Sequence, residues 1–292
     1  MIQIGNLKLE NNIFLAPMAG VTDITFRIIC KKAGCDLTYT EMITARGIFH
    51  KDKRTNRMIQ ILPEEKPVAI QLYGNEPEII AKACEKLNEN DDICLIDINM
   101  GCPTKKVVRR GEGVALMKNP KLAASIIKEA KKVTNKPITA KIRKGFDAKN
   151  INAVDFAKEL EDAGVDAITI HGRTGEQKYE GVADWDIIKE IKKIVKIPVI
   201  GNGSIFNAYD AVKMFQITEC DGIMIARGAI GNPWIFHEIK QMLKEKNITQ
   251  PINNEKIMLF DELFKRTITH YGEYRGTSKM QKHIKAYKKT LI

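Results

Sequence analysis

Short runs of mainly apolar residues recur along most of the chain, and more polar segments separate them. The runs are rich in Val, Ile and Leu with few interruptions, whereas a strand with one solvated face alternates apolar and polar residues. They therefore predict strands buried on both faces, as in a parallel sheet. The eight predicted strands fall at residues 12–18, 36–42, 67–72, 93–99, 137–143, 166–171, 198–202 and 222–227.

Most segments between these strands are predicted to be helical, because Pro residues stand near several helix starts and Gly residues follow several helix ends. The segment 45–66 is the exception and is expected to be irregular. The predicted helices fall at residues 22–32, 77–90, 120–133, 151–164, 185–195 and 207–215.

Eight strand–helix units over about 240 residues match the size of a (β/α)8 TIM barrel. A doubly wound open sheet is the alternative, but no Gly-x-Gly-x-x-Gly follows the first predicted strand. We therefore predict an α/β protein with a TIM barrel over residues 1–240. Residues 241–292 are then expected to form a small helical domain.

The helical domain is predicted from helices at 240–246, 255–274 and 279–292. Between residues 255 and 292 there are nine basic and four acidic residues, with Tyr271, Tyr274 and Tyr287 among them. This pattern is typical of an RNA-binding surface, although a solvated helical cap would be similar. The sequence ends without a helix stop signal, so we expect this domain to be truncated.

Composition and charge narrow the class of protein. The 292 residues are 44% apolar, and 47 Lys and Arg against 36 Asp and Glu give a net charge of +11. That charge favours a polyanionic partner, although a generally lysine-rich surface would give the same value. We expect a cytoplasmic protein without a membrane span. No metal site is expected, because the six cysteines include no Cys-x-x-Cys pair.

Chemically active side chains stand at the ends of the predicted strands. Any one of them could be an ordinary strand end, but the carboxyl ends of all eight barrel strands meet at one rim, where barrel enzymes place their active sites. The sequence therefore predicts an active site there. The residues concerned are Glu41, Gln71, Asn99 with Cys102, Lys141 with Arg143, His171, Asn202 with Gly203, and Arg227.

The fourth strand ends in the most distinctive stretch, Asn99-Met100-Gly101-Cys102-Pro103. Pro103 cannot continue a ladder, so the strand should stop abruptly and present a thiol at its tip. A basic loop with Lys105, Lys106, Arg109 and Arg110 follows, which favours proton or nucleophile chemistry on an anionic partner. The alternative is a buried cysteine in a tight turn.

Two glycine-rich stretches follow the seventh and eighth strands, at 201–204 and 226–233. In barrels these two loops, with a short extra helix, commonly bind phosphate. Pro233 is placed to start such a helix, and Arg227 could pair with the phosphate. The same glycines could also serve tight turns alone, but two adjacent loops with an arginine favour the phosphate site.

Together these motifs resemble the tRNA-dihydrouridine synthase family, and most closely its bacterial B-type branch. The resemblance covers nearly the whole chain. It is carried by Ala16-Pro17-Met18-Ala19-Gly20, Gln71-Leu72-Tyr73-Gly74, Asn99 to Pro103, Lys141-Ile142-Arg143, His171-Gly172-Arg173-Thr174, Asn202-Gly203, Ala226-Arg227-Gly228 and Asn232-Pro233-Trp234.

The resemblance implies reduction of the C5=C6 bond of particular tRNA uridines, with FMN as cofactor and NADPH as reductant. It also implies contacts of Ala16, Pro17, Met18, Gln71, Lys141 and His171 with the flavin ring, and of Asn202, Gly203, Ser204, Ala226 and Arg227 with its phosphate. The family often has Asp where Ser204 stands and Gly where Ala226 stands. Substrate contacts are expected at Asn99, Lys105, Lys106, Arg109, Arg110, Arg143 and Arg173.

The mechanism implied is hydride transfer from the reduced flavin to C6 and protonation at C5 by Cys102, because an ordinary thiol is mostly protonated at neutral pH. We expect a monomer that binds tRNA. Two alternatives remain open. One is an FMN oxidoreductase acting on a free pyrimidine, similar to dihydroorotate or dihydropyrimidine dehydrogenases. The other is an RNA-binding barrel that has lost its cofactor.

Overall fold

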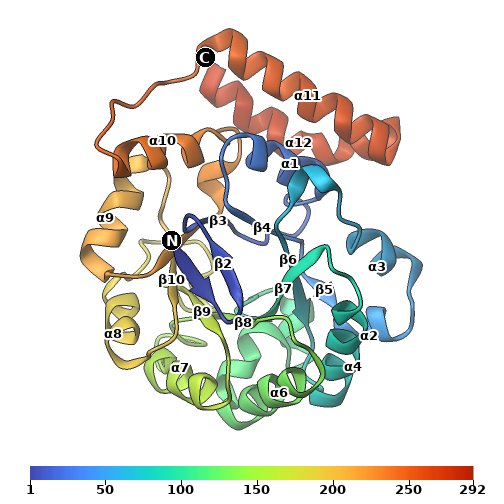
Figure 1. Ribbon diagram of the computed structural model, residues 1–292, viewed down its shortest axis with the longest axis vertical. Coiled ribbons are helices and arrows are strands. Elements are labelled where there is room, and N and C mark those ends of the chain that lie inside the picture. Colours follow the sequence, from blue (N-terminus) through green and yellow to red (C-terminus); the bar gives the residue numbers. More distant parts are fainter. Residues whose placement is uncertain (292) are drawn as a thin grey trace.

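Eight parallel strands close into a barrel in the computed structural model, which describes residues 1–291 (Figure 1). The predicted TIM barrel is thus confirmed. Each predicted strand overlaps an observed one, because the apolar runs are buried between the barrel interior and the surrounding helices. The strands are β3 (Ile13–Leu15), β4 (Leu37–Tyr39) with β5 (Ile43–Thr44), β6 (Val68–Tyr73), β7 (Ile93–Met100), β8 (Ile138–Arg143), β9 (Ala167–His171), β10 (Val199–Asn202) and β11 (Gly222–Ile225).

The second barrel strand is interrupted. β4 pairs with the start of β6 through Thr38 and Val68, and β5 pairs with the other end of β6 through Ile43 and Leu72. The strand predicted at 36–42 is therefore observed only as β4, and β5 occupies the same barrel position just beyond its predicted end. β3 pairs with β4 on one side and with the last strand, β11, on the other, which closes the ring.

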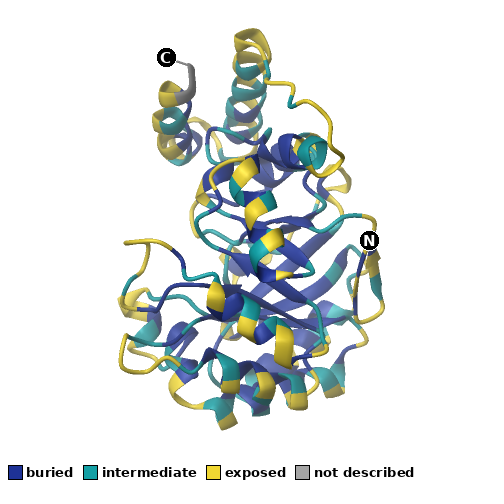
Figure 2. Ribbon diagram, turned by 90° about the vertical axis from the view of Figure 1, so that its left-hand side faces the viewer, coloured by how far each residue is buried: buried dark blue, intermediate teal, exposed yellow. Residues whose placement is uncertain are grey.

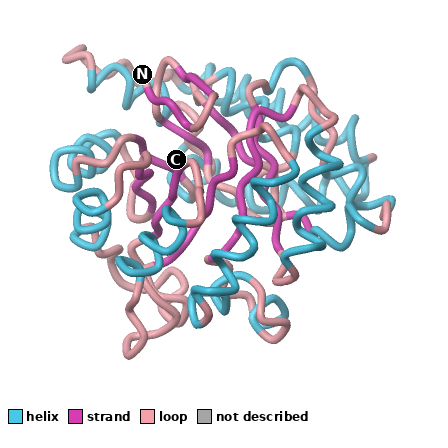
Figure 3. Tube along the Cα trace, turned by 60° about the horizontal axis from the view of Figure 1, so that its bottom comes forward, coloured by secondary structure: helices cyan, strands magenta, loops and turns pink. Residues whose placement is uncertain are grey.

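Helices surround the barrel, and the strands lie inside their ring (Figures 1 and 3). The prediction that residues 45–66 are irregular was wrong, since this segment contains two short helices and a 3-10 turn. The larger outer helices are α1 (Ile24–Lys32), α4 (Pro77–Asn88), α6 (Pro120–Val133), α7 (Ala153–Asp162), α8 (Asp186–Ile194), α9 (Ala208–Thr218) and α10 (Ile235–Leu243). The shorter ones are α2 (Ala45–Phe49), α3 (Lys53–Met58), η1 (Pro63–Glu65), α5 (Lys105–Val108), η2 (Gly113–Lys118) and η3 (Arg227–Ala229).

An antiparallel hairpin of β1 (Ile2–Ile4) and β2 (Leu7–Leu9) covers the end of the barrel opposite the predicted site (Figure 1). Its Ile2, Ile4 and Leu9 side chains pack with barrel-interior residues such as Leu37 and Leu95. The barrel strands are buried along most of their length (Figure 2). This end of the barrel is therefore a packed core.

The C-terminal helices α11 (Asn253–Tyr271) and α12 (Glu273–Leu291) pack against each other beside α1 (Figure 1). Gly272, at a φ of 79°, joins them. Thr25 and Thr267 share a hydrogen bond of 3.0 Å, and Lys279 pairs with Asp23 at 3.0 Å. The helical prediction for this region is confirmed, but α12 begins earlier than the predicted 279. Residue 292 lies outside the described residues.

The boundary between barrel and helical domain stays a prediction. The helix predicted at 240–246 is the end of α10, which crosses the proposed division at residue 240 and ends at Leu243. Residues 244–252 form neither helix nor strand. A division within this segment would leave α10 with the barrel.

Candidate active site

A cavity of about 780 Å³ opens at the carboxyl ends of the barrel strands. Each of the eight strand positions contributes at least one lining residue, because parallel strands all end at this rim. Fifteen of the predicted site residues line the cavity: Ala16, Pro17, Met18, Gln71, Asn99, Cys102, Lys105, Lys141, Arg143, His171, Asn202, Gly203, Ser204, Ala226 and Arg227.

The cavity is strongly cationic. Six Lys and Arg residues line it, and among the residues that the structure describes no Asp or Glu does. Such a lining favours an anionic ligand, since like charges in a partly enclosed space repel one another unless a counter-charge enters. The six are Lys105, Lys141, Arg143, Lys178, Arg227 and Lys282.

Cys102 lies just beyond the end of β7, in a turn fastened by the Asn99 side chain. Oδ1 of Asn99 accepts the backbone N–H groups of Gly101 at 3.2 Å and of Cys102 at 2.9 Å. The Cys102 thiol is half-buried and lies 3.3 Å from Oγ1 of Thr104. The turn thus presents the thiol at the cavity, as the strand-tip pattern predicted.

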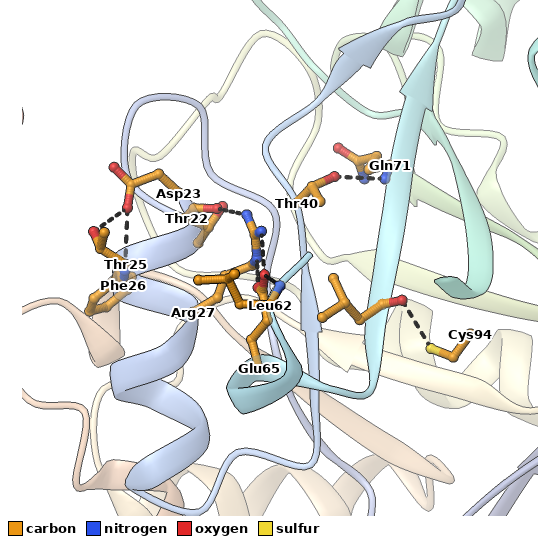
Figure 4. Close-up of polar contacts among 11 residues, drawn as sticks. Thr22, Asp23, Thr25, Phe26, Arg27, Thr40, Leu62, Glu65, Gln71 and Cys94 are labelled. Atoms are coloured by element: carbon orange, nitrogen blue, oxygen red, sulfur yellow. Dashed lines mark hydrogen bonds and ion pairs between the residues drawn. The ribbon is translucent and has the colours of Figure 1, made fainter. Parts of the chain in front are cut away.

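Gln71 connects this turn to a buried carboxylate. Its Oε1 accepts from Nδ2 of Asn99 at 2.8 Å, and its Nε2 donates to Asp97 at 2.6 Å. The backbone N–H of Gln71 donates to Thr40 at 3.1 Å (Figure 4). Burial raises the pKa of Asp97 to about 6, although hydrogen bonds from Gln71 and Thr139 oppose the shift.

Lys141 on β8 donates to Oδ1 of Asn202 on β10 at 2.9 Å, and Nδ2 of Asn202 donates to the carbonyl of Met224 at 2.7 Å. Burial, with the nearby charge of Arg143, lowers the pKa of Lys141 to about 7, while Asp97 opposes that shift. The pKa of Lys141 is therefore close to neutral pH, and an anion in the cavity would favour the charged form of Lys141.

His171 on β9 is held neutral. Burial and the surrounding cations Lys141, Arg143 and Arg173 lower its pKa far below the ordinary value. Its Nε2 lies 3.2 Å from Nη1 of Arg173, and a guanidinium can only donate, so Nε2 accepts and Nδ1 carries the proton. His171 thus presents an uncharged ring to the cavity.

The loops after β10 and β11 approach the cavity closely. Gly203 has a φ of 110°, and a Cβ there would lie 2.7 Å from Cδ2 of His171, so the position requires glycine. Oγ of Ser204 accepts from Arg173 at 2.9 Å and from the backbone of Ala183 at 3.0 Å. The Arg227 guanidinium lies 5.0 Å from the ring centroid of Tyr179 and 5.3 Å from that of Phe206.

Arg143 and Arg173, predicted to contact substrate, are both buried and bonded to the chain itself. Arg143 donates to the carbonyls of Gly101, Thr174 and Lys178 at 2.7–3.0 Å. Arg173 donates to the Glu180 carbonyl at 2.9 Å, and it does not line the cavity. These contacts fit a role in holding the rim loops together, so direct contact with RNA stays a prediction.

The basic segment after Cys102 is partly helical, as α5. Its four predicted RNA contacts, Lys105, Lys106, Arg109 and Arg110, are all exposed. Only Lys105 reaches the cavity, and the others lie outside it. They are therefore placed as a basic surface next to Cys102 and not as part of the cavity itself.

Comparison with known proteins agrees with this geometry. The family model described as "Dihydrouridine synthase (Dus)" matches residues 14–292. The chain belongs to the dihydrouridine synthase family. Its curated relatives include a "Probable tRNA-dihydrouridine synthase" of Rickettsia conorii, 42% identical over 98% of this chain and 87% of the relative. A "tRNA-dihydrouridine synthase B" of Pasteurella multocida is 39% identical over 98% of this chain and 86% of the relative.

Solved structures resemble this family member in fold alone. An old yellow enzyme homologue from Zymomonas mobilis has a TM-score of 0.60 at 14% identity, covering 87% of this chain and 94% of that one. The amine oxidase HisD from Pseudomonas geniculata has a TM-score of 0.64 at 12% identity, covering 84% of this chain and 49% of that one. Both likenesses support the barrel.

Several lining residues of this dihydrouridine synthase family member were not predicted. Lys178 and Tyr179 come from the loop after β9, Phe206 from the loop after β10, and Lys282 from α12. No local sequence pattern predicts the contacts of Arg227 with Tyr179 and Phe206, because the three residues are far apart in sequence. Asp97 was also missed, although a carboxylate inside the run Leu95-Ile96-Asp97-Ile98 was a signal of a buried polar network.

Two further findings concern membrane spans and metal sites. Among residues 1–291 no helix is long and apolar enough to cross a membrane. The described residues also contain no group of three or more His, Cys, Asp and Glu side chains placed to hold a metal ion.

Proposed function

We propose that this protein reduces particular uridines of tRNA to 5,6-dihydrouridine, with a bound flavin and with Cys102 as the proton donor. Family membership supports the reaction and the substrate. The observation that carries the proposal is the cavity itself, where a thiol at a strand tip faces a space lined by six cations and no carboxylate among the described residues.

The cavity fits FMN. Its volume of about 780 Å³ accommodates a flavin with part of a substrate, and Ala16, Pro17 and Met18 offer an apolar wall. Lys141 would donate to the polar edge of the ring, and the loops at Gly203 and Arg227 would take the phosphate. When bound, FMN supplies the hydride carrier between NADPH and the pyrimidine ring.

Cys102 supplies the proton. A hydride added at C6 of uracil leaves negative charge on C5 and on O4, so a proton donor is needed at C5. Asn99 binds the turn through its Oδ1 and donates one Nδ2 hydrogen to Gln71. Its second Nδ2 hydrogen would donate to a pyrimidine carbonyl. The product gains one hydride and one proton across the C5–C6 bond, and the thiolate is reprotonated from solvent.

The tRNA surface that we propose is a second cleft beside the cavity. The cleft lies between the segment 52–60 and the C-terminal helices, and it shares Ala19 and Met42 with the cavity. Tyr274 is 90% exposed there, which suits stacking with an unpaired base. Four basic residues of the cleft, Lys53, Arg54, Arg57 and Arg275, can bind phosphates. Three carboxylates, Asp23, Glu41 and Asp52, also line the cleft, and Asp23 pairs with Lys279.

This arrangement supports a uridine that leaves its stack to enter the cavity while the flanking strand lies in the cleft and on α5. We also propose the cytoplasm as its site of action, since tRNA is the substrate.

The alternative is a flavin oxidoreductase acting on a free pyrimidine, which the same cavity would admit. The experiment that separates the two supplies the purified protein with NADPH and either an unmodified tRNA transcript or free uracil. We expect dihydrouridine in the tRNA and no turnover of uracil. A protein without flavin absorption that binds tRNA but never modifies it would instead support an RNA-binding barrel.

A further inference from the structure

We propose that Asp97 is a positioning residue that fixes the turn carrying Cys102, acting through the carboxamides of Gln71 and Asn99. We call these three side chains the amide relay. The catalytic consequence rests on the proposed function, whereas the structural consequence can be measured without it.

The relay follows from strand register. Asp97 on β7 stands level with Gln71 on β6 and with Thr139 on β8. Asn99 lies two residues further along β7, so it points to the same side of the barrel wall as Asp97. Every link is short: Thr139 to Asp97 is 2.6 Å, Gln71 to Asp97 is 2.6 Å, and Asn99 to Gln71 is 2.8 Å.

The direction of each hydrogen bond is fixed from the Cys102 end. Backbone N–H groups of Gly101 and Cys102 can only donate, so Asn99 must turn its oxygen toward them. Its Nδ2 then donates to Oε1 of Gln71, and Nε2 of Gln71 must find an acceptor. Asp97 is that acceptor, and it has no exposed surface, so bulk solvent does not compete for the bond.

An acceptor at position 97 is therefore required for the whole chain of bonds. Without one, Gln71 leaves a buried N–H unpaired or reverses its amide. A reversed Gln71 would present N–H to the N–H of Asn99, and a reversed Asn99 would present N–H to the backbone donors of the turn. Reversal of both amides removes the two bonds that hold Cys102, whereas an unpaired or singly reversed Gln71 weakens the support of the Asn99 amide that makes them.

Three variants test this reasoning. Asp97→Leu removes the acceptor and is similar in size. Asp97→Asn keeps an oxygen for Gln71 and turns its N–H toward the Thr139 hydroxyl, which can accept. The matched control is Asp166→Leu at the opposite end of the barrel, where Asp166 pairs with Lys131 and caps the Ile138 N–H without reaching the cavity.

The measurement is amide hydrogen exchange at Gly101 and Cys102 by NMR on the purified full chain. We expect exchange about tenfold faster in Asp97→Leu, and rates within about threefold of the unaltered protein in Asp97→Asn and Asp166→Leu. Unchanged protection in a folded Asp97→Leu overturns the proposal. Equal acceleration in Asp97→Asn and Asp97→Leu also overturns it, because the acceptor is kept in the first.

If Asp97→Leu does not fold, Gln71→Met breaks the same relay at its middle residue. It should speed hydrogen exchange at the Gly101 and Cys102 amides by the same factor of about ten. Normal protection in a folded Gln71→Met contradicts the relay.

The catalytic consequence is measured separately. Oxidation of the reduced enzyme by tRNA should slow about tenfold in Asp97→Leu, with reduction by NADPH nearly unchanged. Equal slowing of both steps would contradict a role of Asp97 confined to the turn that carries Cys102. An unaltered protein inactive on tRNA would refute the proposed function and leave the exchange result standing.

Discussion

The Nζ atom of Lys141 lies 2.9 Å from Oδ1 of Asn202, so a hydrogen bond spans the carboxyl ends of β8 and β10 across the intervening β9. This bond aims an ammonium into a cavity that holds five other Lys and Arg side chains. Neutral His171 stands on β9 between them, and Asp97 and Arg143 are the charged groups that act most strongly on Lys141. An anion bound beside Lys141 would therefore favour its charged form.

Lys141→Met should weaken FMN binding about tenfold, because it removes one charge-assisted hydrogen bond. The free protein loses the Lys141 proton as the pH rises through about 7, so this advantage of the unaltered protein over the variant should shrink between pH 6 and pH 8.5. Fluorescence titration of flavin-free protein at several pH values measures it. Lys192→Met, on α8 and paired with Asp221, is the control. A constant ratio of affinities across this range would contradict the assigned role of Lys141.

The proposed tRNA cleft can be tested with its exposed tyrosine. Tyr274→Ala should raise the Kd for tRNA about tenfold without changing flavin content, because one stacking contact is lost. Tyr209→Ala on α9, which is also well exposed, is the matched control and should bind tRNA normally. Filter binding with an unmodified transcript gives both values. Equal affinities for the two variants would move the RNA away from this cleft.

Charge in the same cleft gives an independent readout. Arg57→Ala should reduce the slope of log Kd against log salt concentration by about 1, because one phosphate contact is lost. The weakening should be similar for different tRNA sequences. An unchanged slope would show that Arg57 makes no phosphate contact.

A buried ion pair joins Arg27 of α1 to Glu65 of η1 (Figure 4). It anchors the end of the segment 45–66, which the sequence pattern predicted to be irregular. Nη2 of Arg27 donates to Glu65 at 3.2 Å, and Nη1 donates to the Thr22 carbonyl at 3.0 Å. Glu65→Ala should lower the free energy of unfolding by about 3–5 kcal/mol, since an unpaired guanidinium would stay buried. Urea denaturation measures this. Glu129→Ala, at an exposed pair with Lys132, should change it by less than about 1 kcal/mol.

The barrel and much of its rim could be predicted because both follow from local patterns. Continuous apolar runs fix strands that are buried on both faces, and strand ends in such a barrel must meet. This reasoning predicts one rim for Gln71, Asn99, Lys141, His171 and Asn202, and all five line the cavity. The helices at 45–58 were missed because each is only about a turn long and has little periodicity.

The remaining site residues depend on packing that no local pattern encodes. Lys282 reaches the cavity only because α12 docks beside α1. Arg143 is predicted to contact substrate from its place at a strand end, and its bonds to three loop carbonyls could not be foreseen because those loops are distant in sequence. Asp97 was hidden inside an apolar run, and its role is visible only once β6 and β8 are placed on either side.

The most direct test of the account concerns Cys102 itself. Cys102→Ala should retain its flavin and accept electrons from NADPH at the normal rate, because the thiol takes no part in either step. Rapid-mixing oxidation of the reduced variant by unmodified tRNA should then be slower by at least about 100-fold, in line with the loss of a general acid. Dihydrouridine formation at the normal single-turnover rate in Cys102→Ala would contradict the assignment of Cys102 as the proton donor.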